Sequence, residues 1–452
     1  MKSLNFMKRI LLSLLFSSIT LATAQARQPN VILIYTDDQG TIDVNCYGAK
    51  DLTTPHMDGL AKRGVKFNQF YSAAPVCSPS RAAVITGRYP QRAQIPGNVS
   101  SHKGHAGMPA NQVTMAETFR AAGYNTAHIG KWHLGYDEAT MPNSQGFNYS
   151  FGHMGGCIDN YSHFFYWNGP NRHDLWKNGH EIWRDGSYFP QLMVDEASAF
   201  IEANQTKPFF MYFAMNIPHY PLQGTEKWRQ HYKDLEAPRR MYATLISTMD
   251  EMIGKLVGKV ESLGLREDTI IVFQSDHGHS QEERTFGGGG SAGIYRGAKF
   301  SLFEGGIRVP AIISWPGHLP EGASRDQLAT AVDWFPTVAK LAGIKRIEHR
   351  IDGKDITDLL MSAEAQSPHE VFHWQTGGGK NPPWAVRKGD WKLLGNPRDT
   401  SMKAPITPAD KLFLANLRED PTEMTNFAKQ QPEVVNELLK LHEQWVVDVK
   451  NQ

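Results

Sequence analysis

The chain has 452 residues, 40% of them hydrophobic, which is enough for one large domain and a smaller one. Its formal net charge of +1 gives no reason to expect nucleic acid or an anionic membrane surface as a partner. An aromatic content of 11% suits carbohydrate stacking and a large core equally, so composition does not separate these uses.

The N-terminus has the pattern of a secretory signal peptide. Lys2, Lys8 and Arg9 precede an apolar run at residues 10–21, and small residues around Ala24 offer two cleavage points. The run is too short to span a bilayer, and no later segment is long and apolar enough to do so. We therefore expect residues 1–26 to be removed and the mature protein to be periplasmic or secreted, without stable membrane insertion.

Buried strands alternate with helices along the first three quarters of the chain. Residues 30–35 (NVILIY) form a continuous apolar run of strand length, and residues 208–215 and 269–274 repeat that pattern. A capping box at residues 114–117 opens a helix that leads to a further strand at 125–129. This alternation predicts an α/β fold with a large mixed, mostly parallel sheet sandwiched by helices.

The last hundred residues have a different texture, with short strands and turns. The alternating run Trp384-Ala385-Val386-Arg387 is typical of a half-buried strand, and apolar spacing over residues 432–447 predicts an amphipathic helix. We expect a catalytic domain over residues 27–345 and a smaller C-terminal subdomain over 346–452, with an antiparallel sheet and one helix.

Polar groups follow directly after four of the predicted strands. They are Asp37-Asp38, the pair Lys131 and His133, His219, and Asp276-His277. In sheets of this kind, functional sites gather beyond the carboxyl ends of the strands. These groups are therefore predicted to converge on one pocket.

The segment Cys77-Ser78-Pro79-Ser80-Arg81 favours a reactive group at its first position. Pro79 is well placed in the first turn of a helix over residues 80–85. Cys77 would then lie just before a helix N-terminus, where the dipole and Arg81 would lower the pKa of a thiol. From these residues alone, a buried structural cysteine, a nucleophilic thiol and a redox thiol all remain open.

Continued by Thr86-Gly87-Arg88, this segment resembles the signature of the type I sulfatases of the alkaline-phosphatase-like superfamily. In that family a formylglycine-generating enzyme reads C-x-P-x-R in the unfolded chain and converts the cysteine to Cα-formylglycine. The hydrated aldehyde then attacks the sulfur of a sulfate ester. The resemblance implies that Cys77 is the precursor of the nucleophile and that sulfate monoesters are hydrolysed to alcohol and inorganic sulfate.

Two pairs of residues at predicted strand ends point to a bound cation. Adjacent carboxylates repel, so Asp37-Asp38 at a strand end favours a positive partner, although an ordinary turn would explain the pair alone. Asp276-His277 repeats the situation, and oxygen ligands favour Ca²⁺, with Mg²⁺ as the alternative. The resemblance implies that these four residues bind one divalent cation together with residue 77; His277 stands where Asn is more usual in the family.

The resemblance also implies roles for the remaining polar groups. An extended backbone would put Lys131 and His133 on the same side. Lys131 and Lys299 would contact the sulfate, with Arg81 in the same catalytic set. His133 would be the base that releases sulfate, and His219 would protonate the departing alkoxide, with His279 as a weaker rival. Lys299 precedes the family-like run Glu304-Gly305-Gly306-Ile307-Arg308-Val309-Pro310, in which Arg308 is expected to be structural.

Secretion and family together point to a sulfated saccharide as substrate. Residues 157–176 are dense in aromatic and hydrogen-bonding side chains and are either a sugar-recognition segment or an ordinary surface insertion. The glycine run at residues 287–290 is expected near the pocket rim. The polar candidates for sugar contacts are Asp159, Asn160, His163, Arg172 and His173, with Trp384 and Arg387 as lesser ones.

The sequence leaves two other classes of protein open. A formylglycine-dependent phosphonate or phosphodiester hydrolase and a catalytically silent sugar-binding relative would carry much the same motifs. If Cys77 is converted, Cys46 and Cys157 are left, and they either form a disulfide or stay as two free thiols.

Overall fold

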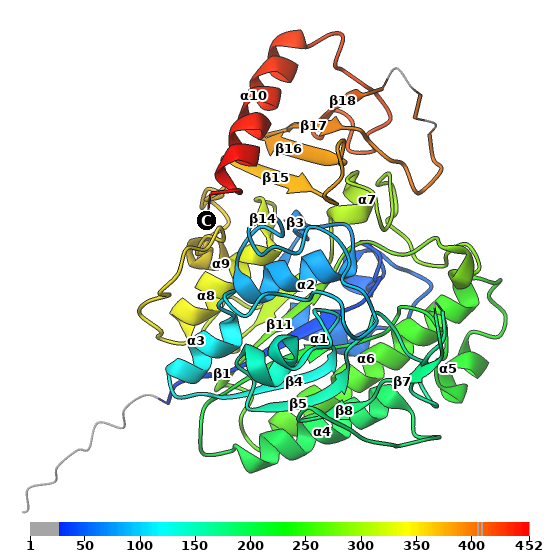
Figure 1. Cartoon of the computed structure of the whole chain (residues 1–452), viewed down its shortest axis with the longest axis vertical. Helices are drawn as coiled ribbons and strands as arrows, with labels where there is room; N and C mark the ends of the chain where they lie inside the picture. Colours follow the sequence, from blue (N-terminus) through cyan, green and yellow to red (C-terminus); the bar gives the residue numbers. More distant parts are fainter. Residues whose placement is uncertain (1–26, 168, 405, 408–409, 452) are drawn as a thin grey trace, which may run out of the picture.

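The computed structural model describes residues 27–167, 169–404, 406–407 and 410–451. The predicted signal peptide therefore lies outside the described residues. A ten-stranded sheet runs through the larger part of the molecule (Figure 1). In spatial order its strands are β13 (Ala323–Arg325), β2 (Val65–Phe67), β12 (Ala311–Ser314), β11 (Thr269–Ser275), β1 (Asn30–Thr36), β10 (Phe209–Ala214), β4 (Asn125–Lys131), β5 (Tyr149–His153), β8 (Trp176–Lys177) and β9 (His180–Glu181).

The centre of this sheet is parallel and buried on both faces. Strand β1 pairs in parallel with β10 and β11, and β4 continues the parallel set to β5. Val31, Leu33 and Tyr35 of β1 join the apolar cluster on one face, whereas Ile32 and Ile34 join the cluster on the other. Because both faces of the sheet are covered, side chains on both sides of such a strand must be apolar, which explains the continuous apolar run at residues 30–35.

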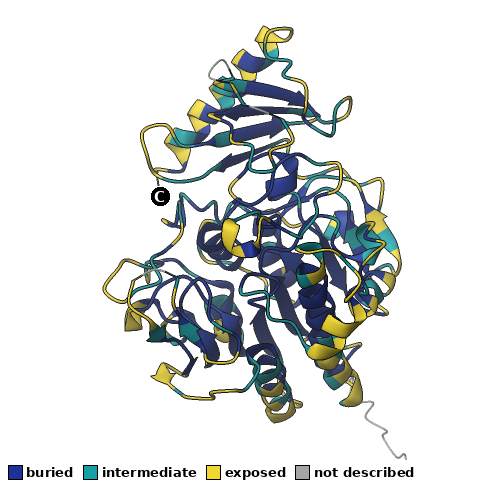
Figure 2. Cartoon of the chain, turned by 90° about the vertical axis from the view of Figure 1, so that its right-hand side faces the viewer, coloured by how far each residue is buried: buried dark blue, intermediate teal, exposed yellow. Residues whose placement is uncertain are grey.

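Helices cover both faces of the sheet, and Figure 2 shows the strands in the buried colour between them. One face is packed by α2 (Cys77–Thr86), α3 (Met115–Ala121), α8 (Trp334–Leu341) and α9 (Thr357–Met361). The other is packed by α1 (Pro55–Lys62), α4 (Phe189–Ala203), α5 (Glu226–His231) and α6 (Arg239–Ser262). Thr114 and Glu117 form the predicted capping box at the start of α3. The predicted α/β architecture is confirmed.

A second sheet of four antiparallel strands lies towards the C-terminus: β15 (Val371–Gln375), β16 (Trp384–Lys388), β17 (Trp391–Gly395) and β18 (Leu412–Asn416). Helix α10 (Pro432–Asp448) packs on one face of it (Figure 1). On the other face, Lys392 extends to Glu304 of α7 (Glu304–Ile307), with 2.8 Å between Nζ and Oε1. The predicted antiparallel sheet and helix are confirmed, and the boundary at residue 345 stays a prediction.

Short elements connect these layers. Two pairs of short strands are β3 (Phe70–Tyr71) with β14 (Ala329–Thr330), and β6 (Phe164–Phe165) with β7 (Arg172–His173). The 3₁₀ helices are η1 (Asn45–Tyr47), η2 (Glu138–Thr140), η3 (Pro142–Gln145), η4 (Glu283–Thr285) and η5 (Ala331–Asp333). Among the described residues, no helix combines the length and the apolarity that crossing a bilayer requires.

Candidate active site

Two neighbouring strands end at the same edge of the sheet, and acidic residues follow both. Asp37 and Asp38 come after β1, and Asp276 and His277 come after β11. The two strands are parallel and in register, so their carboxyl ends lie together. The backbone N–H of Asp38 donates to Asp276 Oδ1 at 3.1 Å. The strands thus gather these buried side chains into one cluster.

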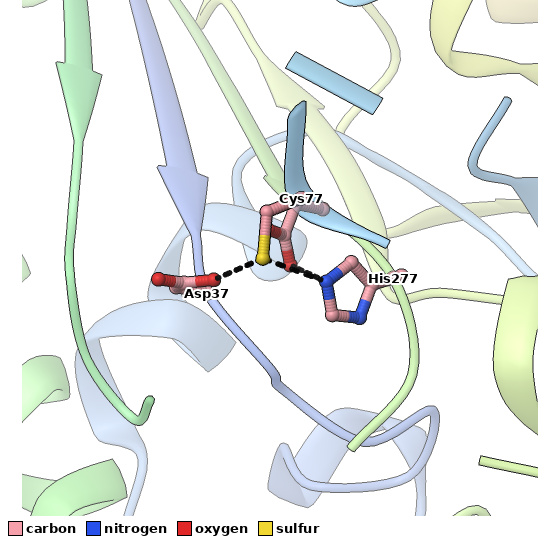
Figure 3. Close-up of side chains that lie close together, drawn as sticks. Asp37, Cys77 and His277 are labelled. Carbon is pink, nitrogen blue, oxygen red and sulfur yellow. Dashed lines mark hydrogen bonds and ion pairs between the residues drawn. The ribbon is translucent and has the colours of Figure 1, made fainter. Parts of the chain in front are cut away.

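Cys77 lies in this cluster as the first residue of α2. Its Sγ is 3.7 Å from Asp37 Oδ1 and 3.5 Å from His277 Nε2 (Figure 3). The helix begins at Cys77 itself and not at Ser80 as expected. Pro79 permits this because first-turn N–H groups have no intrahelical partner. Residue 77 therefore lies at the positive end of the helix dipole.

Three cationic side chains pair with the carboxylates beneath Cys77. Lys131 Nζ lies 2.6 Å from Asp37 Oδ2, and Arg81 Nη2 lies 3.2 Å from Asp276 Oδ2. Lys299 Nζ lies 3.0 Å from Asp38 Oδ2. All three cationic side chains are at most 3% exposed, so these pairs interact with little screening by water.

The charges around residue 77 stabilise an anion there. Burial alone would raise the pKa of the Cys77 thiol, but the ammonium groups of Lys131 and Lys299 lower it to about 6. Burial also opposes ionisation of Asp37, yet Lys131 holds the pKa of that carboxyl well below its usual range. The site is therefore built to hold negative charge on the group at position 77.

The same cluster fits a divalent cation. Burial raises the pKa of Asp38 and of Asp276, and the neighbouring cationic side chains offset this effect only in part, so a further positive charge would stabilise both carboxylates. Asp38 Oδ1 is buried and has no hydrogen-bond partner among the described residues. Ligand-type atoms lie within 4.8 Å of one another in two sets, Asp37, Cys77, Asp276 and His277, and Asp37, Asp38, Cys77 and His219. This oxygen-rich donor set suits a hard ion with one imidazole ligand.

A pocket of about 320 Å³ opens above Cys77. Of the predicted site residues, Cys77, His133, His219 and Lys299 line it. The remaining predicted residues lie deeper, where they are at most 1% exposed: Asp37, Asp38, Arg81, Lys131, Asp276 and His277. The predicted groups thus lie together in the structure, in one layer that lines the pocket and a second layer beneath it.

His133 reaches the pocket by a different route from the one expected. Strand β4 ends at Lys131, and His133 has a φ of +54°, so the backbone is not extended up to this residue. Its Nε2 donates to the carbonyl oxygen of Val99 at 3.1 Å, and its Nδ1 is buried without a partner among the described residues. Burial lowers the pKa of His133 well below its usual value, with help from Lys131. The ring is therefore neutral and can accept a proton at Nδ1.

His219 faces the cluster from the loop after β10. Its Nδ1 donates to the carbonyl oxygen of Tyr220 at 2.8 Å, and its Nε2 lies 3.7 Å from Asp38 Oδ2. Burial lowers the pKa of His219 well below its usual value. His279, the weaker candidate for the same task, is not among the residues that line the pocket.

The loop that carries Lys299 is held by a segment from the C-terminal region. The backbone N–H of Gly297 donates to Ser401 Oγ at 2.9 Å, and that of Ala298 donates to Thr400 Oγ1 at 3.1 Å. Arg296 forms an ion pair with Asp399, with 2.8 Å between Nε and Oδ2. On the other side of Lys299, Ser301 Oγ donates to the carbonyl oxygen of Arg398 at 2.7 Å. We call residues 398–401 the clamp segment, since its contacts position the backbone on either side of Lys299.

One wall of the pocket is aromatic and comes from the segment proposed for sugar recognition. Cys157, Phe165 and Trp167 line the pocket, and the Trp167 ring lies 5.2 Å from that of Tyr220. The five polar residues expected to contact sugar are not among the lining residues, because their side chains bond within the fold. The partners are Gln223 for Asp159, Asn216 for Asn160, Ser187 for His163, His102 and Tyr136 for Arg172, and Glu181 for His173.

Two charged residues of the pocket were not predicted from the sequence. Glu282 lies 3.2 Å from Lys299 Nζ, and Arg284 lies over the ring of Tyr220 at 4.8 Å from its centre. They lie in and beside the short helix η4, where no periodic pattern or motif marks them. The glycine run at residues 287–290, expected at the rim, is not among the lining residues.

The lesser candidates also have structural partners. The Trp384 ring stacks on His442 at 4.0 Å, and Arg387 donates to Tyr71 Oη at 2.5 Å. Arg308 donates to the carbonyl oxygen of Asn68 and pairs with Glu304, as expected for a structural residue. Cys46, Cys77 and Cys157 are all free thiols. Cys46 and Cys157 therefore do not form a disulfide with each other.

Comparison with known proteins identifies the family. The family model described as Sulfatase matches residues 29–344, and one described as N-sulphoglucosamine sulphohydrolase, C-terminal, matches residues 293–450. The chain belongs to the sulfatase family and is a hydrolase of sulfate esters.

Several relatives match over most of the chain. Arylsulfatase A of Homo sapiens is 31% identical over 467 residues, covering 94% of this chain and 89% of the relative. Steryl-sulfatase of Homo sapiens is 32% identical over 427 residues, covering 77% of this chain and 72% of the relative. The solved structure of Ps i-CgsB in complex with k-i-k-neocarrahexaose is 29% identical with a TM-score of 0.82, and 93% of each chain is covered.

Proposed function

We propose that this sulfatase acts on a sulfated saccharide, with a formylglycine derived from Cys77 as its nucleophile. The observation that carries the proposal is the position of Cys77 Sγ, between a buried carboxylate–histidine cluster and a pocket with an aromatic wall. Phe165 and Trp167 offer flat apolar surface of the kind that sugar rings pack against. Similarity to a protein whose structure holds neocarrahexaose, at 29% identity, supports the same substrate class.

Burial of the signature supports conversion before folding. Pro79 and Arg81 are buried in α2, and Cys77 is 2% exposed. A formylglycine-generating enzyme that reads this segment would therefore need the unfolded chain. We propose that it is a transient partner during export, and that residues 1–26 direct the chain to the periplasm or outside the cell.

The proposed cation is Ca²⁺, with Mg²⁺ as the alternative. Asp37, Asp38, Asp276 and His277 would hold it together with residue 77. The buried Asp38 Oδ1, which has no hydrogen-bond partner among the described residues, would be one of the ligand atoms. When bound, the ion supplies positive charge that offsets negative charge building up on the sulfate group.

The remaining side chains divide the work of binding and proton transfer. Lys131 and Lys299 would hold sulfate oxygens, and Arg81 would keep Asp37 and Asp276 in place. The neutral His133 would take a proton at Nδ1. Bound sulfate would raise the pKa of His219, because negative charge nearby favours the imidazolium, and that ring would protonate the leaving alcohol oxygen from Nε2.

The test uses protein made together with a formylglycine-generating enzyme. Mass spectrometry of the peptide containing Cys77 should show loss of one sulfur and two hydrogens and gain of one oxygen. Sulfate release should then be measured on a panel of defined sulfated saccharides, an aryl sulfate and an aryl phosphonate, with Cys77→Ala as the inactive control. Faster turnover of the phosphonate would favour the phosphonate hydrolase. An unconverted thiol with saccharide binding but no sulfate release would favour the silent sugar-binding relative.

A further inference from the structure

A second group of metal-ligand side chains lies apart from the Cys77 cluster. His163, His173 and Asp185 each offer a ligand-type atom, and these atoms lie within 4.8 Å of one another. None of the three lines the pocket, and none belongs to the cluster of carboxylates around Cys77. The residues come from three places, just before β6, in β7 and in the turn before α4.

In each of the two histidines, one ring nitrogen forms a hydrogen bond and the other has no partner among the described residues. His163 Nε2 lies 3.1 Å from the carbonyl oxygen of Ser187, and His173 Nδ1 lies 3.1 Å from Glu181 Oε1. Both oxygens only accept, so these two nitrogens carry the protons. In the neutral rings the lone pairs therefore lie on His163 Nδ1 and His173 Nε2, which are buried and have no partner among the described residues.

This pattern is the one that metal-binding imidazoles adopt. A ligating histidine usually donates its other N–H to a carbonyl or carboxylate, which fixes the tautomer and the orientation of the ring. Ser187 and Glu181 fill these two positions here. Leaving a buried acceptor unpaired is unfavourable, so two such atoms on imidazole rings whose centres lie 6.1 Å apart need an explanation.

We propose that His163, His173 and Asp185 form a second metal site, for a transition ion of the Zn²⁺ type. Two imidazoles and one carboxylate are a common ligand set for Zn²⁺, with water as the fourth ligand. Ca²⁺ is a poor occupant because it prefers six or more oxygen ligands. Asp185 is exposed, and one of its carboxylate oxygens already lies within 4.8 Å of a ring nitrogen of each histidine, so it would complete the shell from the solvent side.

The site would brace the aromatic wall of the pocket. His173 pairs with Phe164 across the β6–β7 hairpin, and the next residue, Phe165, lines the pocket. Asp185 belongs to the turn that leads into α4. An ion shared by the three residues would tie the hairpin to that turn, and this effect is separate from the chemistry at Cys77.

The test counts Zn²⁺ on protein already loaded with Ca²⁺. After equilibration with Zn²⁺ and removal of the excess, elemental analysis should find one more equivalent in the wild type than in His173→Gln. Asp185→Asn should lower Zn²⁺ occupancy, and the matched control Asp234→Asn, another exposed aspartate, should not. Zn²⁺ should also raise the melting temperature of the wild type more than that of Asp185→Asn.

Anomalous X-ray scattering at the zinc edge then locates the ion. A peak between the two imidazoles and Asp185 is the expected result. Equal Zn²⁺ content in the wild type, His173→Gln and Asp185→Asn would overturn the proposal, as would a peak only at the carboxylates beside Cys77. If His173→Gln does not fold, the comparison of Asp185→Asn with Asp234→Asn decides the matter, because both substitutions are at exposed positions.

Discussion

Lys299 Nζ lies 3.0 Å from Asp38 Oδ2, although 261 positions separate the two residues in the chain. The same ammonium group lies 3.2 Å from Glu282 and lines the pocket above Cys77. One side chain thus joins the loop after β1, the loop after β11 and the space where a sulfate group would bind. A change at Lys299 should therefore affect both binding and stability.

Lys299→Met should lower kcat/KM for an aryl sulfate by roughly 10²-fold or more, because a preorganised charge facing the developing negative charge is lost. The variant should also be less stable, since Asp38 would keep its buried carboxylate with one cation fewer. Steady-state kinetics and thermal unfolding check both effects. Lys403→Met, which removes an exposed ammonium group bonded to backbone carbonyls, is the control. Wild-type kcat/KM in Lys299→Met would contradict the assigned role.

The clamp segment should influence catalysis without touching substrate. Ser401→Ala removes the acceptor for the Gly297 N–H, a bond of about 1 kcal/mol, so kcat/KM should fall about fivefold if that bond positions Lys299. Ser362→Ala, at a hydroxyl that bonds Glu364 on the surface, should leave kcat/KM unchanged. Kinetics well below the melting temperature separate positioning from unfolding. A lower melting temperature with unchanged kcat/KM would mean that the clamp is purely structural.

The buried layer of the site could be predicted from the sequence because it follows from the sheet. Strands β1 and β11 are continuous apolar runs, and the residues after parallel strands must meet at one edge. Asp37, Asp38, Asp276 and His277 are placed by that rule alone. The motif at Cys77 added the nucleophile, since the order of its residues is specific.

The pocket wall could not be predicted in the same way. Which side chains of residues 157–176 face the pocket depends on the pairing of the β6–β7 hairpin, where Phe165 lies opposite Arg172. In that pairing Arg172 turns to Tyr136 and His102, and Phe165 turns to the pocket. Glu282 and Arg284 reach the pocket from a loop without periodicity. Such positions depend on tertiary contacts that leave no local pattern.

Trp167→Ala should impair saccharide substrates more than a small aryl sulfate. Trp167 is half-buried beside Tyr220, and its loss removes apolar surface worth about 1.5 kcal/mol or more, so KM for a saccharide should rise roughly tenfold. The aryl sulfate should show little change, because it does not need to extend to this wall. Trp228→Ala, at a half-buried tryptophan on α5, is the matched control. Equal losses on both substrates would contradict a role in sugar recognition.

The C-terminal subdomain should lose stability in acid through two buried histidines. Burial lowers the pKa of His442 to about 4 and that of His373 to about 3. In the unfolded chain both side chains have a pKa of about 6.5, so below that pH the unfolded state binds more protons than the folded state. The free energy of unfolding therefore falls as the pH drops below about 6.5. At about pH 5, each ring has lowered it by about 2 kcal/mol relative to its value at neutral pH.

His442→Phe isolates one of these rings, because the replacement can keep the stacking on Trp384 while removing the titrating group. Between about pH 7 and about pH 5, the variant should lose about 2 kcal/mol less unfolding free energy than the wild type. Urea unfolding followed by tryptophan fluorescence at several pH values measures the difference. His180→Gln, at an exposed position on β9, should follow the wild-type curve. Parallel curves for His442→Phe and wild type would show that His442 does not carry the acid sensitivity.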